Sequence, residues 1–543
     1  MRDNNTNMSD LYIIAIGGSG ERILKSFVML MTAGVPVGAE HIHPVIIDND
    51  EHSHALTQCL DLIRFYRSNP TSSQPKEHGR TGAHHLYNMI SDDARDWGSF
   101  FSAIIDEPVV LNRAGSEIGN LANVIGGIDD ESNHLYKRVK EELDLLFTQD
   151  DLDMPLNVGF VGNPNIGSIV LNSQSLQEDA FKEIKDNLSS NDGVIVLGSL
   201  FGGTGAAGIP LVVNTLHAIA PANRPTIGTV AVLPYFKLQG EDKANIIDVE
   251  RWDVNSDSFE TKTRAALMYY DQYMKDQTDY QYYAGDGDAK DVFDHNVGGD
   301  SQNNRTHIVE LLSAMSIIDF SKQSRHGNVT YKIPIWGINQ KRDSVSSTNI
   351  SGASNAEVKK ALAKFQMLKV IFQNPNFLTW AVKNKLPYVD GIGIDQSIIE
   401  SVAVTGKEES FAHAWGINHL FQEWDKWFSE LGFADAKRRF MLYKSVSDAT
   451  DSNIAELFYS NEPSGKGIAK VEKRMERMEG KILKRHEVEY VIPAEVSEAL
   501  MAVYNKRYPK GLTGVDPKKK IGTMLKIISD ALDIVINDKC INF

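Results

Sequence analysis

One stretch of this sequence has the residue types that bind phosphate through the main chain. In residues 194–210, an aliphatic run predicts a buried strand, and the apolar residues 211–219 predict a helix. Between them lie four glycines within residues 202–208. Such a loop lets backbone N–H groups turn toward an anion, and the positive end of the following helix favours phosphate. The candidate contacts are Gly202, Gly203, Thr204, Gly205 and Ala206.

The start of the chain repeats this arrangement. Residues 11–16 are a short apolar run that predicts a strand, and residues 21–31 have helical periodicity. A glycine-rich turn joins them, made of Gly17, Gly18, Ser19 and Gly20. Glycine-rich turns between a strand and a helix also occur where no ligand binds, so each loop taken alone leaves both interpretations open.

Acidic residues follow the next predicted strand. Residues 44–47 are a buried-type apolar run that ends at Asp48, Asn49 and Asp50. Acids at the carboxyl end of a strand beside a phosphate loop can hold a metal-bound water or a ribose. Taken alone, these first two strands also fit a dinucleotide-binding Rossmann unit, with the acid on the ribose.

A third turn of phosphate-contact type follows a long segment without a chemical constellation. Residues 51–155 have a mainly helical and irregular pattern, which we interpret as an inserted helical arm. A strand is predicted at 156–161, then the turn Gly-Asn-Pro-Asn-Ile-Gly that begins at Gly162 and Asn163, and then a helix at about 175–188. A parallel α/β sheet requires this alternation of strands and helices.

The composition is that of a soluble globular chain with several domains. The 543 residues are 42% hydrophobic and 24% charged, with a mean hydropathy of −0.28. At ~100 to 200 residues per domain, about two to four domains are expected. The net charge of −16 argues against a protein that mainly grips nucleic acid by its phosphates. The stretch from Lys466 onward is locally basic, which a solvated helix face explains.

Cysteine and histidine usage predicts neither a disulfide framework nor a structural metal site. Cys59 and Cys540 lie far apart in the chain, which favours a reducing, cytoplasmic compartment. Histidine pairs such as His41/His43 are not accompanied by matching Cys or carboxylate ligands. No run of ~18 apolar residues predicts a membrane span, and the polar residues 1–10 do not form a signal peptide.

Together, the loops resemble the tubulin/FtsZ superfamily of GTP-binding, filament-forming proteins. The family's signature reads Gly-Gly-Gly-Thr-Gly-(Thr/Ser)-Gly, and residues 201–207 read Phe-Gly-Gly-Thr-Gly-Ala-Ala. Phe201, Ala206 and Ala207 are the departures from it. Residues 17–20 resemble the first phosphate loop, and the acids at 48–50 are similar to the second, where the family places a nucleotide or magnesium contact.

The resemblance continues through the third loop to the ribose loop. The turn that starts at Gly162 resembles the bacterial Asn-Pro-Glu-Val-Gly. After a strand predicted at 227–233, residues 238–243 resemble the ribose loop Phe-Glu-Gly-x-x-Arg. Gln239 then stands at the glutamate and Lys243 at the arginine.

A long apolar helix, predicted to end at about Phe320, resembles the family's central helix. In the family, its first turn carries the Asn or Asp that reads guanine, and Asn303, Asn304 or His307 could do this. An N-cap and a surface histidine would explain the same residues. The choice of guanine therefore comes from the resemblance.

For hydrolysis, the resemblance implies acids supplied by the next subunit, in the motif Asn-x-Asp-x-x-(Asp/Glu). The best match starts at Asn355, keeps the first acid as Glu357 and has Lys360 at the second. A carboxylate orients the attacking water and takes its proton, whereas a lysine with a pKa of ~10.4 cannot take it. Hydrolysis is therefore expected to be slow, with Asp319 and Asp343 as the next candidates.

The expected architecture is α/β: a parallel-sheet, Rossmann-like nucleotide-binding domain of tubulin/FtsZ type, a long central helix, a smaller α+β domain and a helical C-terminal extension. A strand at 330–338 and a helix at about 357–372 would belong to the smaller domain. The expected boundaries are 1–304 with the insertion at 51–155, 305–323, 324–430 and 431–543.

The leading hypothesis is a cytoplasmic protein that binds GTP or GDP with Mg²⁺ at Asp48 and Asp50. It would assemble head to tail into filaments of identical subunits and hydrolyse GTP slowly. The alternative is a nucleotide-dependent sensor or scaffold subunit of a larger cytoplasmic complex. An NAD-binding oxidoreductase fits only the first loop and the two acids. The helical insertion or the C-terminal region could engage a protein partner, and no membrane span or nucleic-acid partner is expected.

Overall fold

The structure is a computed structural model in which most of the first 323 residues and parts of the remainder are described. The described residues are 8–39, 41–50, 53–67, 100–111, 119–125, 134–154, 156, 159–160, 162–238, 258–286, 291–293, 304–323, 330–332, 355–373, 418–432, 499–500, 502–503, 505–506 and 526–534.

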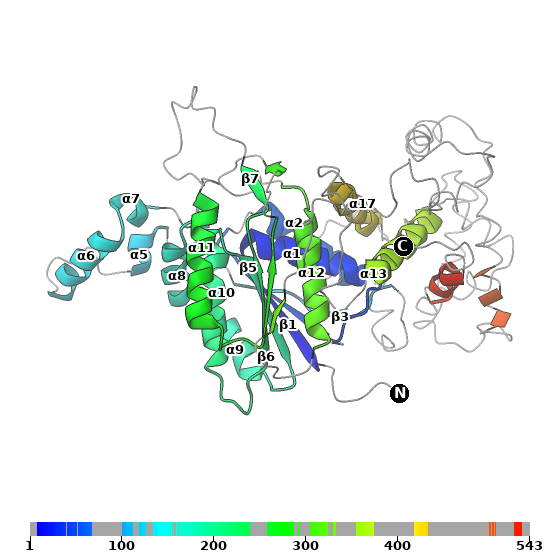
Figure 1. The fold of residues 1–543 in the computed structure, drawn as a ribbon, viewed down its shortest axis with the longest axis horizontal. Coiled ribbons are helices and arrows are strands. Elements are labelled where there is room, and N and C mark those ends of the chain that lie inside the picture. The colour runs from blue at the N-terminus through cyan, green and yellow to red at the C-terminus, as the bar shows by residue number, and fades with distance from the viewer. Residues whose placement is uncertain are drawn as a thin grey trace, which may run out of the picture.

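A single parallel sheet organises the described residues (Figure 1). Its strand order is β10-β8-β6-β5-β1-β2-β3, and β4 also pairs with β2. The central strands are aliphatic runs buried along their length, as expected for a parallel sheet covered on both faces. The strands are β1 (Asp10–Ile16), β2 (His41–Ile47), β3 (Ile104–Ile105), β4 (Val109–Leu111), β5 (Gly193–Ser199), β6 (Thr226–Val232), β8 (Tyr280–Ala284) and β10 (Thr330–Lys332).

The strand order reverses between β1 and β5. The chain runs from β1 outward to β2 and its neighbours, then returns to the other side of β1, where Leu11 is in register with Gly193. In open α/β sheets, a ligand binds outside the carboxyl ends of the strands at this switch point. The residues that follow β1 and β5 are therefore the first place to look for a site.

Helices build a hydrophobic core on each face of the sheet (Figure 1). One core receives side chains from α1 (Gly17–Thr32), α2 (His54–Arg67), α12 (Ile308–Ser321), α13 (Asn355–Gln373) and α17 (Asn418–Gly432). The other receives them mainly from α8 (Pro164–Ser173), α9 (Asp179–Asn187), α10 (Gly203–His217) and α11 (Phe259–Tyr269) with its π-helical continuation Tyr270–Met274.

Two smaller parts complete the described fold. An arm projects from the second face, made of α5 (Leu121–Ile125), α6 (His134–Leu146) and α7 (Gln149–Leu152) (Figure 1). A two-stranded sheet pairs β7 (Phe236–Leu238) with β9 (Asp291–Phe293), and the 3-10 turn Ser175–Gln177 precedes α9.

The helix α12 crosses the first face from the carboxyl edge of the sheet to the amino edge. At its start, the His307 ring lies 4.9 Å from the ring of Tyr235, which follows β6. At its end, the Ser321 hydroxyl accepts a hydrogen bond from the Gly38 N–H, before β2. All of its 14 residues are buried. At 1.5 Å per residue, its two ends lie about 21 Å apart.

The segment 51–155 differs from the expectation of a purely helical insertion. It contains α2 and the arm helices, but also β3 and β4, which pair with β2 and extend the main sheet. These strands have only two and three residues, so they leave no period-two pattern in the sequence. Half of the strand expected at 156–161 lies outside the described residues.

Two further elements depart from the expectations. The strand expected in a smaller domain at 330–338 is described over Thr330–Lys332 as β10, and it pairs with β8 in the main sheet. Pro164–Ser173 form an additional helix, α8. The basic residues 466–485 lie outside the described residues, and the boundaries at 324–430 and 431–543 stay a prediction. Among the described helices, none combines the length and apolar character needed to cross a bilayer.

Candidate phosphate-binding site

Two helices begin directly at the switch point, and no side chain caps either of them. α1 starts at Gly17, immediately after β1, so the glycine turn expected before the helix is its first turn. α10 starts at Gly203, with Gly202 as its N-cap. The first N–H groups of a helix have no partner within it. Since neither N-cap residue supplies a side-chain hydrogen bond, both first turns present amides that suit an anion.

The two helix starts touch each other. A Cβ atom added to Gly17 would lie 3.2 Å from Thr204 Cβ and 3.7 Å from the Gly205 nitrogen. Gly17 also has a φ of +67°, a conformation that favours glycine. The structure thus brings together the first loop, residues 17–20, and the signature loop, residues 202–206, although about 180 residues separate them in the chain.

The third loop joins this cluster, but its amides are used differently. A Cβ on Gly203 would lie 3.0 Å from the Asn163 nitrogen and 3.2 Å from the Gly162 nitrogen. Asn163 is the N-cap of α8, and its side-chain oxygen accepts from the nitrogens of Asn165 at 3.1 Å and Ile166 at 3.4 Å. The start of α8 is therefore satisfied by its own cap.

Close packing of helices on strands explains most of the glycines. A Cβ on Gly20 would lie 2.9 Å from the Ala15 carbonyl carbon, and one on Gly205 would lie 2.6 Å from the Ser199 nitrogen. Gly18 is different, because its Cβ would meet only Glu21 Oε2 at 3.9 Å and Ala55 Cβ at 4.0 Å. A side chain at Gly18 would therefore fit within the fold.

Packing also accounts for two departures from the family signature. The Phe201 side chain is buried in an aromatic cluster, with its ring 4.8 Å from Phe259 and 5.6 Å from Phe236. Ala207 lies where α8 crosses α10, and a Cβ on Gly167 would be 2.9 Å from the Ala207 Cβ. Both positions serve the core, and the neighbouring Ala206 is half-buried.

The acids after β2 are buried beside the first turn of α1. Asp48 and Asp50 are 4% and 6% exposed, and the Asp50 N–H donates to Asp48 Oδ1 at 3.1 Å. Burial is the main cause that raises the pKa of Asp48 to about 6. Asn49 is fully buried, and neither atom of its side-chain amide has a partner among the described residues.

A third carboxyl group, not predicted from the sequence, completes this pocket of acids. Glu21 is fully buried one turn into α1, where helix side chains lean toward the N-terminus. Burial first, and then the charge of Asp48 and a hydrogen bond with it, raise the pKa of Glu21 well above its usual value. Its Oε2 accepts from the Ser53 hydroxyl at 3.3 Å, while Oε1 has no described partner. Only its position after the glycine turn could have signalled it.

These residues fit a magnesium ion only in partnership with a phosphate. The described residues hold no group of three or more His, Cys, Asp or Glu side chains arranged to bind a metal ion by themselves. Mg²⁺ at phosphate sites typically takes one or two carboxylates, water and phosphate oxygens. Asp48 and Asp50 supply two buried carboxyl groups, and the Asn49 side-chain amide and Glu21 Oε1 have no partner among the described residues. This group of oxygens matches that requirement.

The start of α12 carries a buried polar network. Arg22 of α1 donates from Nε to Glu310 Oε1 at 2.8 Å and from Nη2 to the Tyr235 hydroxyl at 2.9 Å. His307 is the N-cap of α12, and its Nδ1 accepts from the Val309 nitrogen at 3.2 Å. His307 therefore acts as a helix cap, one of the alternatives that the sequence left open, and it is buried, not on the surface.

Other base and ribose candidates are only partly placed. Asn304 is half-buried just before the network of Arg22, Tyr235 and Glu310. Asn303, Gln239 and Lys243 lie outside the described residues. Arg22 was not predicted from the sequence, since an arginine one turn into an apolar helix has no distinctive spacing.

The residues proposed for hydrolysis lie toward the other edge of the sheet. Glu357, in the first turn of α13, is exposed and raises the pKa of Lys322, although burial lowers that pKa on balance. Lys322 directly follows α12 at the amino edge. Asn355 is the first residue of α13, and Lys360 Nζ lies 3.0 Å from Asp533 Oδ1.

The two reserve candidates for hydrolysis differ in outcome. Asp319 is fully buried and accepts a hydrogen bond from the Tyr282 hydroxyl at 2.6 Å, so it is a core residue that a neighbouring molecule cannot reach. Asp343 lies outside the described residues.

Comparisons with known proteins find likeness only in structure. No known protein family matches the sequence, and no curated protein matches it. Among solved structures, a GTPγS-bound protofilament of CetZ2 from Haloferax volcanii is similar, with 11% identity over 51% of this chain and 49% of that one, at a TM-score of 0.23.

A second similar structure is a GTPγS-form protofilament of TubZ from Bacillus thuringiensis serovar israelensis. It has 10% identity over 58% of this chain and 56% of that one, at a TM-score of 0.21. The chain thus spans about half the length of these proteins. Overlaps with such low TM-scores do not assign a function. The functional proposal therefore rests on the geometry of the loops.

Proposed function

We propose that this chain binds a nucleotide by its phosphates between the starts of α1 and α10. One observation carries the proposal: two uncapped helix N-termini meet at the switch point of the sheet, with Gly17 against Thr204. Each helix start favours negative charge, and two that converge favour a polyanion. A nucleotide di- or triphosphate supplies several negative oxygens within a few ångströms.

The buried acids define the metal part of this proposal. Asp48 and Asp50 would hold Mg²⁺ through water at the terminal phosphate, and Glu21 would orient the same water shell. Bound Mg²⁺ supplies charge neutralisation for the phosphate oxygens. The burial of these carboxyl groups supports the proposal, because a charged group is costly to bury unless a cation or hydrogen bonds compensate for the lost water.

Guanine as the base, and head-to-tail self-assembly, follow from the family resemblance of the four loops. The placement of Glu357 supports assembly. The phosphate loops lie at the carboxyl edge, whereas Glu357 neighbours Lys322 at the far end of α12. An acid placed there can act only on the nucleotide of an adjacent copy. Because Lys360 replaces the second acid, we propose slow hydrolysis at the junction between subunits.

A substitution at Gly18 tests the phosphate site. Gly18→Asp puts a carboxylate in the open space beside the first turn of α1, where it would repel a phosphate. We expect affinity for GTP and GDP to fall on the order of 100-fold or more, since like charges about 4 Å apart repel by several kcal/mol. Calorimetric titration of GTP, GDP and ATP measures this and also tests the base.

Gly18→Ala is the matched control, because its Cβ makes only ordinary contacts. Gly203→Val, the obvious change from the sequence alone, is unsuitable. A Cβ there would lie 2.8 Å from Phe160 Cβ, so this variant would disturb the fold itself. If Gly18→Asp binds as tightly as the wild type while circular dichroism shows it folded, the phosphates bind elsewhere.

The second candidate is a nucleotide-dependent sensor or scaffold subunit that uses the same site without forming filaments. The docking of α17 on α1 favours it, because this helix links the phosphate site to the second half of the chain. Electron microscopy of the purified protein with and without GTP separates the two functions. Filaments support the first, and a discrete particle that binds GTP supports the second.

A further inference from the structure

The arm carries two of the most exposed apolar side chains in the described structure. Leu145 and Leu146, at the end of α6, are 85% and 72% exposed. Their neighbours Leu143 and Phe147 are buried in the hydrophobic core of the second face. One side of this stretch is therefore already covered. The leucine pair therefore forms a second apolar surface, on the outer side. Adjacent exposed leucines mark a contact site more often than isolated ones do.

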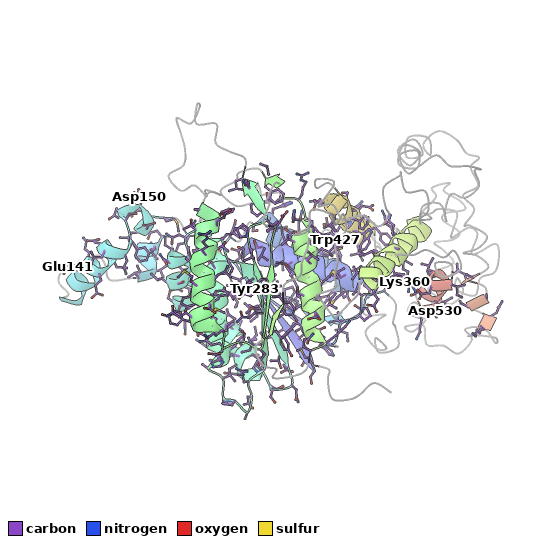
Figure 2. All side chains as sticks on the ribbon, in the orientation of Figure 1. Glu141, Asp150, Tyr283, Lys360, Trp427 and Asp530 are labelled. Carbon is purple, nitrogen blue, oxygen red and sulfur yellow. The ribbon has the colours of Figure 1, made fainter. Side chains whose placement is uncertain are left out.

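The leucine pair lies within an acidic stretch. Residues 141–153 contain six acids, namely Glu141, Glu142, Asp144, Asp150, Asp151 and Asp153, and no Lys or Arg. Figure 2 shows Glu141 and Asp150 on the projecting arm, away from the main sheet. We call Leu145, Leu146 and these six acids the arm surface. Its chemistry fits a partner that is basic and apolar along one side.

One segment of this same chain has the complementary chemistry. Residues 466–485 contain eight Lys or Arg and three Glu. Their apolar residues follow a three-four spacing, at Ile468, Val471, Met475, Met478 and Ile482. This is the pattern of an amphipathic helix with a narrow apolar stripe between basic flanks. Methionines suit such a stripe, because they adapt to irregular apolar surfaces.

The layout of the described residues favours contact between copies. The arm lies at one end of the long axis of the molecule, and the helical residues 526–534, which follow the basic segment, lie at the other (Figures 1 and 2). A contact between two different surfaces of identical subunits does not close on itself, so it generates open assemblies.

We propose that the arm surface binds residues 466–485 of a second copy of this chain. The apolar stripe covers Leu145 and Leu146, while the basic flanks face the six acids. This contact joins molecules along their long axis, which runs across the direction of α12 (Figure 1), and it needs no nucleotide. It is therefore separate from the head-to-tail assembly proposed above, and it would bundle filaments where these form.

Self-association of the full chain without nucleotide tests the contact. Sedimentation velocity should show association that weakens as salt is raised, because charge pairs at a surface are screened. Leu145→Glu with Leu146→Glu should weaken it on the order of tenfold or more, since two apolar side chains lose their cover. Met268→Glu on α11 is the matched control, as Met268 is also 73% exposed.

Charge reversal identifies the partner. One variant carries Glu141→Lys and Asp144→Lys, and the other carries Lys473→Glu and Arg477→Glu. Each alone should associate weakly, and a mixture of the two should recover, because each arm then meets a segment of opposite charge. Failure of the mixture to recover would overturn the proposal, as would association that the leucine variant leaves unchanged.

Discussion

The carboxyl groups beside the first turn of α1 show how much a few residues shape this site. Glu21 and Asp48 share a hydrogen bond within a space that has few donors. A protonated carboxyl group satisfies such a pair in the absence of a cation. With Mg²⁺ and a phosphate bound as proposed, the same oxygens would accept hydrogen bonds from the water around the metal, which would explain why these acids are buried.

Replacing both Asp48 and Asp50 by Asn tests this role. The double variant should bind GTP in Mg²⁺ more weakly, while GDP affinity falls less, because the proposed metal contact is at the terminal phosphate. Titrations with and without Mg²⁺ measure the difference. Asp61→Asn, at an exposed position on α2, is the control. Equal losses for the two nucleotides would mean that these acids serve only the fold.

A second acid-bearing cluster lies at the amino edge of the sheet, far from the phosphate loops. His43 of β2 contacts Asp106 through Nδ1 at 2.8 Å and Asp10 through Nε2 at 3.5 Å. Burial lowers the pKa of His43, but the hydrogen bond and charge of Asp106, with the charge of Asp10, raise it above the ordinary value on balance. The charged histidine therefore joins three segments of the chain.

The raised pKa of His43 predicts a pH-dependent stability. A group with a raised folded pKa stabilises fully below its unfolded pKa of about 6.5, and the contribution is lost as pH rises through the folded value. His43→Gln should therefore lower the melting temperature most below about pH 6.5 and progressively less above it. Thermal melts of both proteins from pH 5.5 to 8.5 measure this. A difference that grows with pH would contradict it.

Among the elements, α17 connects distant parts of the chain. Trp427 donates from Nε1 to the Ser26 hydroxyl of α1 at 3.1 Å. Glu430 accepts from the nitrogen and the hydroxyl of Thr306, directly before α12. Trp424 and Trp427 are both fully buried (Figure 2 labels Trp427). A helix from the second half of the chain thus contacts α1, which begins at the candidate phosphate site, and the residue directly before α12.

Removal of the Trp427 side chain should therefore destabilise the first half of the protein. Trp427→Ala creates a cavity against α1 and should cost about 3–5 kcal/mol of unfolding free energy. Trp427→Phe should cost less, because it removes mainly the hydrogen bond. Urea unfolding measures both, with exposed Gln422→Ala on the same helix as the control. If Trp427→Ala is as stable as the control, α17 does not hold α1.

The helix α12 separates the proposed phosphate site from the residues proposed for hydrolysis. Its first turn faces the Arg22 network near the phosphate loops, and its last turn approaches Glu357. The helix that carries Glu357 also contacts the C-terminal residues, because Asp533 pairs with both Lys360 and Lys364 of α13. A charge change at Lys360 would therefore affect the docking of residues 526–534 as well as the reaction.

Turnover should depend on protein concentration, since in the proposed assembly one copy would complete the site of the next. Glu357→Ala should abolish the remaining hydrolysis, with GTP binding unchanged. Lys360→Asp together with Asp533→Asn should raise turnover, because it adds a proton acceptor, which contributes ~10² to 10⁴ in rate, without facing two acids. Phosphate release over a range of concentrations measures this. Brisk turnover below the assembly concentration would place the catalytic groups elsewhere.

The central strands and the loops that follow them could be predicted from the order of the residues alone. Aliphatic runs of four to seven residues at β1, β2, β5 and β6 predicted buried strands, and the glycine turns after β1 and β5 predicted a change from strand to helix, so a parallel α/β fold was expected. The glycine turns of 17–20 and 202–206 were recognisable because a site built from backbone N–H groups requires glycine at particular positions. The helix α10 was predicted from the apolar residues 211–219, although it begins earlier, at Gly203.

Which of these residues lie together depends on long-range packing. The strand order placed Gly17 against Thr204, and no local pattern encodes a contact over such a separation. Packing placed Glu21 and Arg22 beside the candidate site and Asp319 in the core, because the environment of a charged side chain depends on the elements packed around it. The short strands β3 and β4 are stabilised by pairing with β2, which is long-range in the sequence and leaves no mark in their own residues.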